Sequence, residues 1–163
     1  MARRHTYRAE VVWTGDQGTG TSGYRAYGRG HELRGAGKAA ILGSSDPLFR
    51  GDASRWNPEE LLVASVSACH QLWYLHLCAA AGVVVTGYED HAEGVMLEED
   101  DGAGQFERVT LRPRVTIAAA SDAGAAERLH AEAHAKCFIA RSVNFEVACE
   151  PTIVRAAEAA ELT

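Results

Sequence analysis

The sequence predicts a single α+β domain, in which strands come before, between and after two helices. Three observations support this prediction. A hydrophobic helix with clear start and stop signals lies in the middle of the chain, segments rich in β-branched and aromatic residues lie on both sides of it, and strands and helices do not alternate regularly. We therefore expect residues 1–163 to form one domain, with residues 1–5 and 156–163 as loose ends.

The first third of the chain has the composition of short strands. Residues 7–14 (YRAEVVWT) mix β-branched and aromatic residues and precede a glycine, which predicts a first strand. Shorter strands are expected around residues 24–34 and 38–44. Residues 45–56 carry turn signals without a regular period, so they should form a long connection.

The clearest helix in the chain starts at an Asn-Pro-Glu-Glu segment. Asn57 can cap the helix, Pro58 suits the first helical position, and Glu60 lies three residues beyond the cap, as in a capping box. No glycine or proline follows until Gly82, which supplies the stop. This helix has few polar faces, so we expect it to be largely buried.

The second half of the chain predicts strands around one more helix. Residues 83–97 have strand composition, and in residues 107–117 apolar and polar residues alternate as in a half-exposed antiparallel strand. Asp122 and the serine before it introduce a helix that should run to about Val143. Residues 145–156 are expected to form the last strand.

Charge and hydropathy exclude several classes of partner. The net charge of −6 argues against a nucleic acid or an anionic membrane as a partner. No apolar run reaches the length expected of a membrane span, and the first residues lack the apolar core of a secretion signal. We therefore expect a cytoplasmic protein, in which four cysteines are buried hydrophobes or functional thiols rather than a disulfide framework.

The cysteines taken one at a time say little. Cys69 lies inside the apolar helix and Cys137 on the second predicted helix, and free cysteine is among the most buried residue types. Cys78 and Cys149 have no motif around them, so we assign both to packing.

Two segments together resemble the OsmC/Ohr family of thiol-dependent peroxidases. The first is NPEELLVASVSACH (Asn57–His70), and the second is AHAKCFIARSV (Ala133–Val143). In that family a helix that opens with NPE carries one reactive cysteine, and a second cysteine opens an arginine-containing stretch further along the chain. The resemblance covers most of the chain in the order of its elements. One departure is Phe138, which follows Cys137 where the family usually has proline.

The resemblance implies a fold, an activity and a set of site residues. It implies antiparallel sheets around long central helices, in an intertwined homodimer that reduces organic hydroperoxides. Cys69 would be the peroxidatic thiol and Cys137 the resolving one, and the family's arginine and glutamate correspond to Arg29 and Glu59, with Arg25 as a competitor for the arginine. The resemblance also implies that a dithiol of the lipoyl type recycles the enzyme. No cofactor and no metal ion is implied.

The chemistry of these residues is self-consistent. A thiolate attacks the peroxide, and burial raises the pKa of a thiol, so a guanidinium such as that of Arg29 is needed to hold the charge. Glu59 can orient that guanidinium. Ten residues on a continuous helix separate Glu59 from Cys69 by about 15 Å, however. Either the helix begins later than predicted, or Glu59 completes the site of a neighbouring subunit.

Two alternatives stay open at this point. His130 and His134 are spaced four residues apart on the second predicted helix, with Cys137 one turn further, so these three could bind a metal ion. The apolar first helix and its aromatic residues could instead line a pocket for an apolar ligand without any catalysis.

Overall fold

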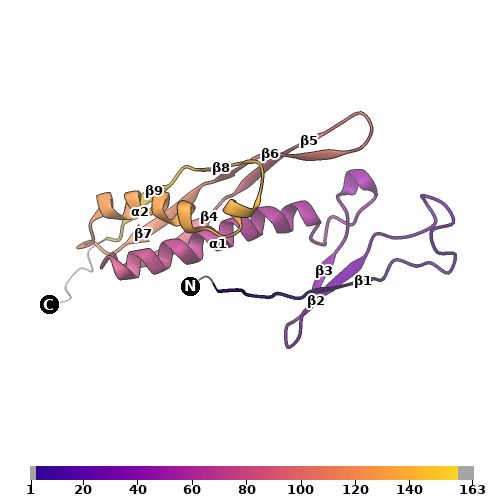
Figure 1. Ribbon diagram of the computed structural model, residues 1–163, viewed down its shortest axis with the longest axis horizontal. Coiled ribbons are helices and arrows are strands. Elements are labelled where there is room, and N and C mark those ends of the chain that lie inside the picture. The colour runs from indigo at the N-terminus through magenta and orange to yellow at the C-terminus, as the bar shows by residue number, and fades with distance from the viewer. Residues whose placement is uncertain (1–2, 158–163) are drawn as a thin grey trace. The chain divides into compact units, whose positions relative to one another are not determined.

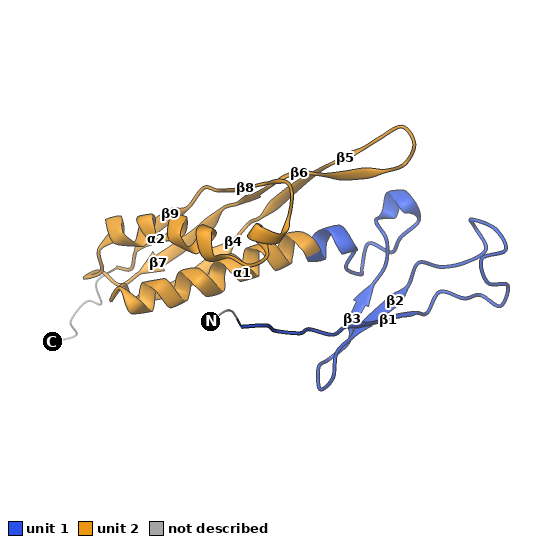
Figure 2. Cartoon of the chain, viewed as in Figure 1, with its two compact units in different colours: residues 1–61 blue, residues 62–163 orange. Residues whose placement is uncertain are grey.

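The computed structural model describes residues 3–157, which divide into two compact units at Leu61 and Leu62 (Figure 2). Strands and helices occur in the order expected of an α+β protein, which confirms the predicted fold class. Residues 1–2 and 158–163, part of the expected loose ends, lie outside the described residues. The expectation of one domain stays a prediction.

The first unit contains a small antiparallel sheet (Figure 1). Its strands are β1 (Glu10–Trp13), β2 (His31–Arg34) and β3 (Ile41–Gly43), in the order β1-β2-β3. All three lie within the segments predicted as strands. The connection that follows contains only a short 3₁₀ helix, η1 (Pro47–Phe49).

Helix α1 (Pro58–Ala80) begins and ends where the sequence predicts. The Asn57 side-chain oxygen accepts a hydrogen bond from the Glu60 backbone N–H at 2.7 Å, and a Glu60 carboxylate oxygen accepts one from the Asn57 N–H at 3.1 Å. These two bonds are the predicted capping box. Gly82 follows the helix with φ of 72°, a left-handed conformation that favours glycine.

Only one side of α1 is buried. That side carries Val66, His70, Tyr74 and Leu77, whose spacing of three or four residues follows the helical period. Leu72, on another side, is 68% exposed, so the expectation of a largely buried helix is wrong for the isolated chain.

Length and composition alone make α1 the one helix among residues 3–157 that could cross a membrane. From the sequence, no apolar run was expected to reach the length of a membrane span. The buried core helix of an ordinary domain meets the same criterion, and α1 packs its buried side against strands and a second helix.

The second unit contains two mixed three-stranded sheets (Figure 1). One has the order β4-β7-β9 and the other β5-β6-β8. Their bounds are β4 (Val85–Asp90), β5 (Glu93–Glu98), β6 (Gly104–Leu111), β7 (Pro113–Ile117), β8 (Glu146–Cys149) and β9 (Thr152–Arg155). The β6–β8 and β7–β9 pairs are parallel, whereas β4–β7 and β5–β6 are antiparallel. The sequence predicts three long strands in this half, and each prediction of a single strand is wrong. Each of these segments instead forms two strands, one in each sheet.

Arg112 marks the point where the strands divide. Its backbone N–H donates to the Asp90 carboxylate at 2.7 Å, and its guanidinium reaches Glu93 at 3.1 Å and Glu150 at 3.2 Å. Proline at position 113 has no N–H to continue the ladder. The side chain of Arg112 thus joins the three points at which the chain passes from one sheet to the other.

Helix α2 (Ala123–Lys136) ends earlier than predicted. The Asp122 carboxylate caps its start by accepting hydrogen bonds from the backbone N–H groups of Gly124 and Ala125, at 2.8 and 3.2 Å. Cys137 has an extended conformation and closes the helix, and a 3₁₀ helix, η2 (Ala140–Ser142), follows it. The prediction that Cys137 lies within a helix running to Val143 is therefore wrong.

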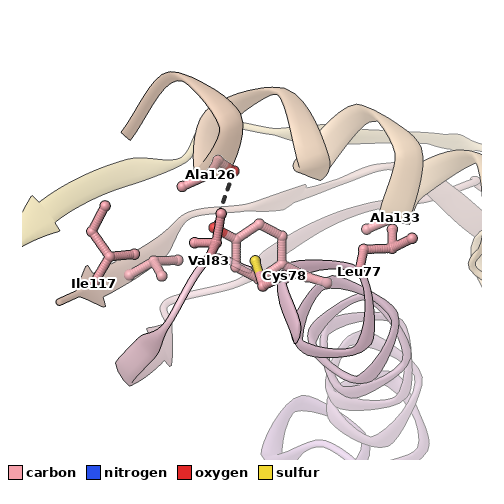
Figure 3. Packing of buried hydrophobic residues seen from close by; sticks show 8 residues of the cluster. Leu77, Cys78, Val83, Ile117, Ala126 and Ala133 are labelled. Carbon is pink, nitrogen blue, oxygen red and sulfur yellow. Dashed lines mark hydrogen bonds between the residues drawn. The ribbon is translucent and has the colours of Figure 1, made fainter. Parts of the chain in front are cut away.

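The main core lies where α1, α2 and the β4-β7-β9 sheet meet (Figure 3). Tyr74 is fully buried there, and its hydroxyl donates to the Ala126 carbonyl of α2 at 3.0 Å, the dashed line in Figure 3. Cys78 lies in the same core, as expected of a packing cysteine. The other buried members are Leu77, Val83, Val115, Ile117, Ala126 and Ala133.

Candidate active site

Two free thiols from different helices meet in the second unit. Cys69 lies on α1 and is half-buried, whereas Cys137 lies at the end of α2 and is fully buried. The Cys69 thiol is close enough to Cys137 to raise the pKa of the Cys137 thiol. The structure thus brings together the two cysteines that the sequence paired.

The environment of Cys137 keeps it protonated at neutral pH. Burial raises the pKa of its thiol to about 11, and the neighbouring Cys69 adds to the rise. The Ala140 backbone N–H donates to Sγ at 3.4 Å and acts in the opposite direction, because it favours the thiolate. Burial is the larger effect, so Cys137 is a thiol at neutral pH.

Cys69 opens into an apolar pocket of about 360 Å³. The residues lining this pocket are Cys69, Leu72, Trp73, His76 and Phe138. Because Cys137 is not among these lining residues, a molecule in the pocket contacts Cys69 and not Cys137.

The helical period explains how this pocket forms. On α1, Leu72, Trp73 and His76 follow Cys69 by three, four and seven residues, so all four share one side of the helix. Phe138 reaches the pocket because α2 ends at Cys137, and its ring packs edge-on against Trp73 at 5.6 Å between centroids. The early end of α2 therefore places both the second sulfur and one wall of the pocket.

Arg29 is held in place by residues of its own unit. Its guanidinium lies over the rings of Tyr24 and Tyr27, at 4.5 and 4.0 Å from their centroids, and donates to the backbone carbonyls of both residues. Arg25 is exposed. Arg29 belongs to the first unit and the cysteine pair to the second, so its role beside Cys69 stays a prediction.

Glu59 lies in the first turn of α1. Because the helix begins at Pro58 and continues without a break to Ala80, the option of a later helix start is wrong. Glu59 and Cys69 are then about 15 Å apart along one helix axis. A glutamate side chain does not span that distance.

A second cluster lies on the buried side of α1. His70 Nε2 is 3.0 Å from His130 Nδ1, and the Cys149 sulfur is 3.7 Å from the first nitrogen and 3.9 Å from the second. Within the described residues this is the group of metal-ligating atoms that converges, and His134 and Cys137 are not part of it. The alternative that His130, His134 and Cys137 together bind a metal ion is therefore wrong. The assignment of Cys149 to packing alone also missed these contacts.

Burial sets the protonation of this cluster. It lowers the pKa of His70 to about 4, against the opposing effect of Asp90, and lowers that of His130 to about 3. Burial also raises the pKa of Cys149 to about 12. Both imidazoles are therefore neutral at pH 7, and Cys149 is a thiol.

Solved structures with the same architecture include one at 30% sequence identity. This is an OsmC-like protein of unknown function from Vibrio cholerae, with a TM-score of 0.83 over 91% of this chain and 100% of that one. An organic hydroperoxide resistance protein from Elizabethkingia anophelis has a TM-score of 0.68 at 16% identity, over 96% of this chain and 100% of that one. An organic hydroperoxide resistance protein from Bacillus subtilis has a TM-score of 0.61 at 20% identity, over 90% of this chain and 98% of that one. At these lower identities the likeness shows the fold alone.

The family comparison covers both cysteine motifs. No curated protein sequence matches the chain. The family model of the OsmC-like proteins, however, matches residues 51–152, which include Cys69, Cys137 and helices α1 and α2. The chain therefore belongs to the family of OsmC-like proteins.

Proposed function

We propose that this protein is a thiol-dependent peroxidase that reduces organic hydroperoxides through Cys69 and Cys137. One observation carries the proposal: Cys69 lines an apolar pocket, and the protonated thiol of Cys137 lies buried beside it. Membership of a family whose fold is shared by organic hydroperoxide resistance proteins supports it.

In the first step the Cys69 thiolate attacks the terminal oxygen of the hydroperoxide. The O–O bond breaks, the sulfur becomes a sulfenic acid, and the alkoxide takes a proton and leaves as an alcohol. Sulfur is oxidised by two electrons and the peroxide is reduced by two. Cys69 rather than Cys137 takes this role because it is the cysteine that lines the pocket.

In the second step the Cys137 thiol attacks the Cys69 sulfenic acid. A disulfide forms and water leaves, so the two thiols together supply both electrons. The adjacency of the two sulfurs supports this step. We propose that a dithiol of the lipoyl type then reduces the disulfide, and that the protein works in the cytoplasm, where thiols are kept reduced.

The pocket favours a substrate with an apolar group. Its side chains contribute two aromatic rings and a leucine, and its volume is that of a small-molecule site. Hydrogen peroxide gains nothing from such a surface, whereas an aryl or alkyl hydroperoxide can bury its hydrocarbon part there.

We further propose that a homodimer completes the site with Arg29 and Glu59. Glu59 cannot reach Cys69 along its own helix, so it would act in the partner's site and orient the arginine that holds the thiolate. Co-refolding Glu59→Ala chains with Cys69→Ser chains tests this. A heterodimer has one site with both groups intact, so activity should return, and mixtures that stay inactive would contradict the shared site.

Steady-state turnover tests the proposed activity. We expect wild-type protein to reduce cumene hydroperoxide with a higher kcat/KM than hydrogen peroxide, with dihydrolipoamide as the reductant. Cys69→Ser should be inactive, and Cys78→Ala, the matched control on the same helix, should keep its activity. Activity that survives in Cys69→Ser would overturn the assignment. Binding of cumene hydroperoxide without turnover in the wild type would favour the non-catalytic ligand-binding alternative.

A further inference from the structure

We propose that His70, His130 and Cys149 form a binding site for a zinc-type metal ion, separate from the Cys69–Cys137 pair. This inference does not depend on the peroxidase activity. The sequence offered a different metal set, His130, His134 and Cys137, and assigned Cys149 to packing. The three residues come from α1, α2 and β8, and their ligand atoms lie within 4.8 Å of one another.

The distances among the three atoms fit a tetrahedral ion. With bonds of about 2.05 Å to nitrogen and 2.3 Å to sulfur, tetrahedral angles require about 3.3 Å between the nitrogens and about 3.6 Å from each nitrogen to sulfur. The corresponding distances here are 3.0 Å between the nitrogens, and 3.7 and 3.9 Å to sulfur. The two rings are nearly coplanar, with 5.3 Å between their centroids, so their nitrogens now face each other as in an N–H···N hydrogen bond. Each ring must turn by roughly 35° in its plane for both lone pairs to point at one tetrahedral ion.

The ligand types select the ion. Two imidazole nitrogens and one thiolate form a borderline-soft set that suits Zn²⁺, whereas Mg²⁺ and Ca²⁺ require oxygen ligands. Three protein ligands leave a fourth position, which a water molecule can fill.

The cluster is also where buried polar atoms lack partners. Within the described residues, four buried side-chain nitrogen or oxygen atoms make no hydrogen bond: His70 Nδ1, His130 Nε2, His134 Nδ1 and Tyr88 Oη. The first two belong to the proposed ligands themselves. His134 is close enough to act on His70, and Tyr88 is close enough to act on Cys149. An ion bound at His70 Nε2 and His130 Nδ1 does not pair these two ring nitrogens, which lie on the opposite edges of the imidazoles and carry their protons when the ion is bound.

The charge balance near the cluster suits a cation. Asp90 lies close enough to act on both His70 and Cys149, and its carboxylate is fixed by hydrogen bonds from Ser67 Oγ at 2.5 Å and from the Arg112 N–H at 2.7 Å. When the ion binds, Cys149 loses its proton and becomes a thiolate. Thiolate and carboxylate together then match the two positive charges of the ion.

Such an ion would hold the second unit together. One bond each to α1, α2 and β8 would fix the two helices to the strand that ends at Cys149. Because the unfolded chain has no preformed site, binding free energy becomes folding stability.

Cobalt titration of the Cys69→Ser/Cys137→Ser chain tests the site, because this background removes the other pair of neighbouring thiols. After treatment with a chelator, we expect one Co²⁺ per chain, a thiolate-to-cobalt charge-transfer band, and displacement by Zn²⁺. Adding Cys149→Ser should abolish the band, and adding His130→Gln should weaken binding about 100-fold, a loss of 2.7 kcal/mol. Adding Cys78→Ser, the matched control, should change neither. Circular dichroism checks that each variant is folded.

X-ray absorption at the zinc edge supplies a readout that needs no ligand variant. On the same Cys69→Ser/Cys137→Ser chain we expect one sulfur at about 2.3 Å and nitrogens at about 2.0–2.1 Å. No saturable binding, a metal ion held only when Cys69 and Cys137 are present, or a zinc shell without sulfur would each overturn the proposal.

Discussion

Oxidation by peroxide should stabilise this protein against unfolding. One equivalent of cumene hydroperoxide added to the reduced chain should join Cys69 to Cys137, which closes a loop of roughly 70 residues in the unfolded state. The chain-entropy relation gives a stabilisation of about 4 kcal/mol for a loop of that length. The sulfurs are neighbours in the reduced fold, so rearrangement should remove little of this gain.

Urea unfolding measures the effect. With a denaturant dependence of about 2 kcal/mol per molar for a chain of this size, the midpoint should rise by about 2 M in the oxidised protein. The rise should disappear when a dithiol is added, because the crosslink is then lost.

Cys137→Ser is the control, because Cys69 then has no partner with which to form the crosslink. Mass measurement after the treatment confirms the loss of two hydrogens and the absence of added oxygen. Equal midpoints for oxidised and reduced wild type, or the same rise in Cys137→Ser, would refute the reasoning.

Further predictions concern the two thiols, the pocket and the core. In Cys137→Ser the reaction should stop after the first chemical step, so that the sulfenic acid of Cys69 accumulates. Dimedone should trap this sulfenic acid, as a mass increase shows, whereas the wild type should give no such adduct. Phe138→Ala should raise KM for cumene hydroperoxide about tenfold and leave hydrogen peroxide unaffected, whereas Leu97→Ala, equally apolar and exposed elsewhere, should change neither. Tyr74→Phe removes a buried hydrogen bond to the Ala126 carbonyl, which keeps its helical bond within α2, and should cost about 0.5–1.5 kcal/mol in urea unfolding. The Cys137 thiol has a pKa of about 11 in the folded protein, against an ordinary value of 9.0 in the unfolded chain. As the pH rises from 9 to 11, the unfolded chain therefore loses this proton first and is favoured. The free energy of unfolding of the reduced wild type should then fall faster than that of Cys137→Ser.

Local signals in the sequence were sufficient to predict helix α1. Its start depends on Asn57 and Glu60, which bond each other across three residues, and its end depends on Gly82. Interactions of this kind lie within one turn of helix, so the sequence displays them directly.

The division of the strands between two sheets could not be predicted. Val109 and Leu111 in β6, and Val115 and Ile117 in β7, are all fully buried and keep one alternation through the break. Periodicity reports which face is buried and not which strand is the partner. The break depends on Arg112 and on contacts with distant parts of the chain.

The two cysteine sites differ in how far the sequence predicts them. Cys69 and Cys137 could be paired only because their surrounding motifs resemble a known family. His70, His130 and Cys149 meet across separations of 60 and 79 residues, with no spacing motif, and only the packing of α1, α2 and β8 brings them together. Side-chain clusters of this kind follow from the fold rather than from any local pattern.

Disulfide mapping tests the central claim most directly. Reduced protein is treated with one equivalent of cumene hydroperoxide, remaining thiols are alkylated, and the digested peptides are analysed by mass spectrometry. The account predicts a Cys69–Cys137 disulfide, with Cys78 and Cys149 recovered as alkylated thiols. A disulfide that involves Cys78 or Cys149 instead, or consumption of the peroxide with all four thiols intact, would contradict it.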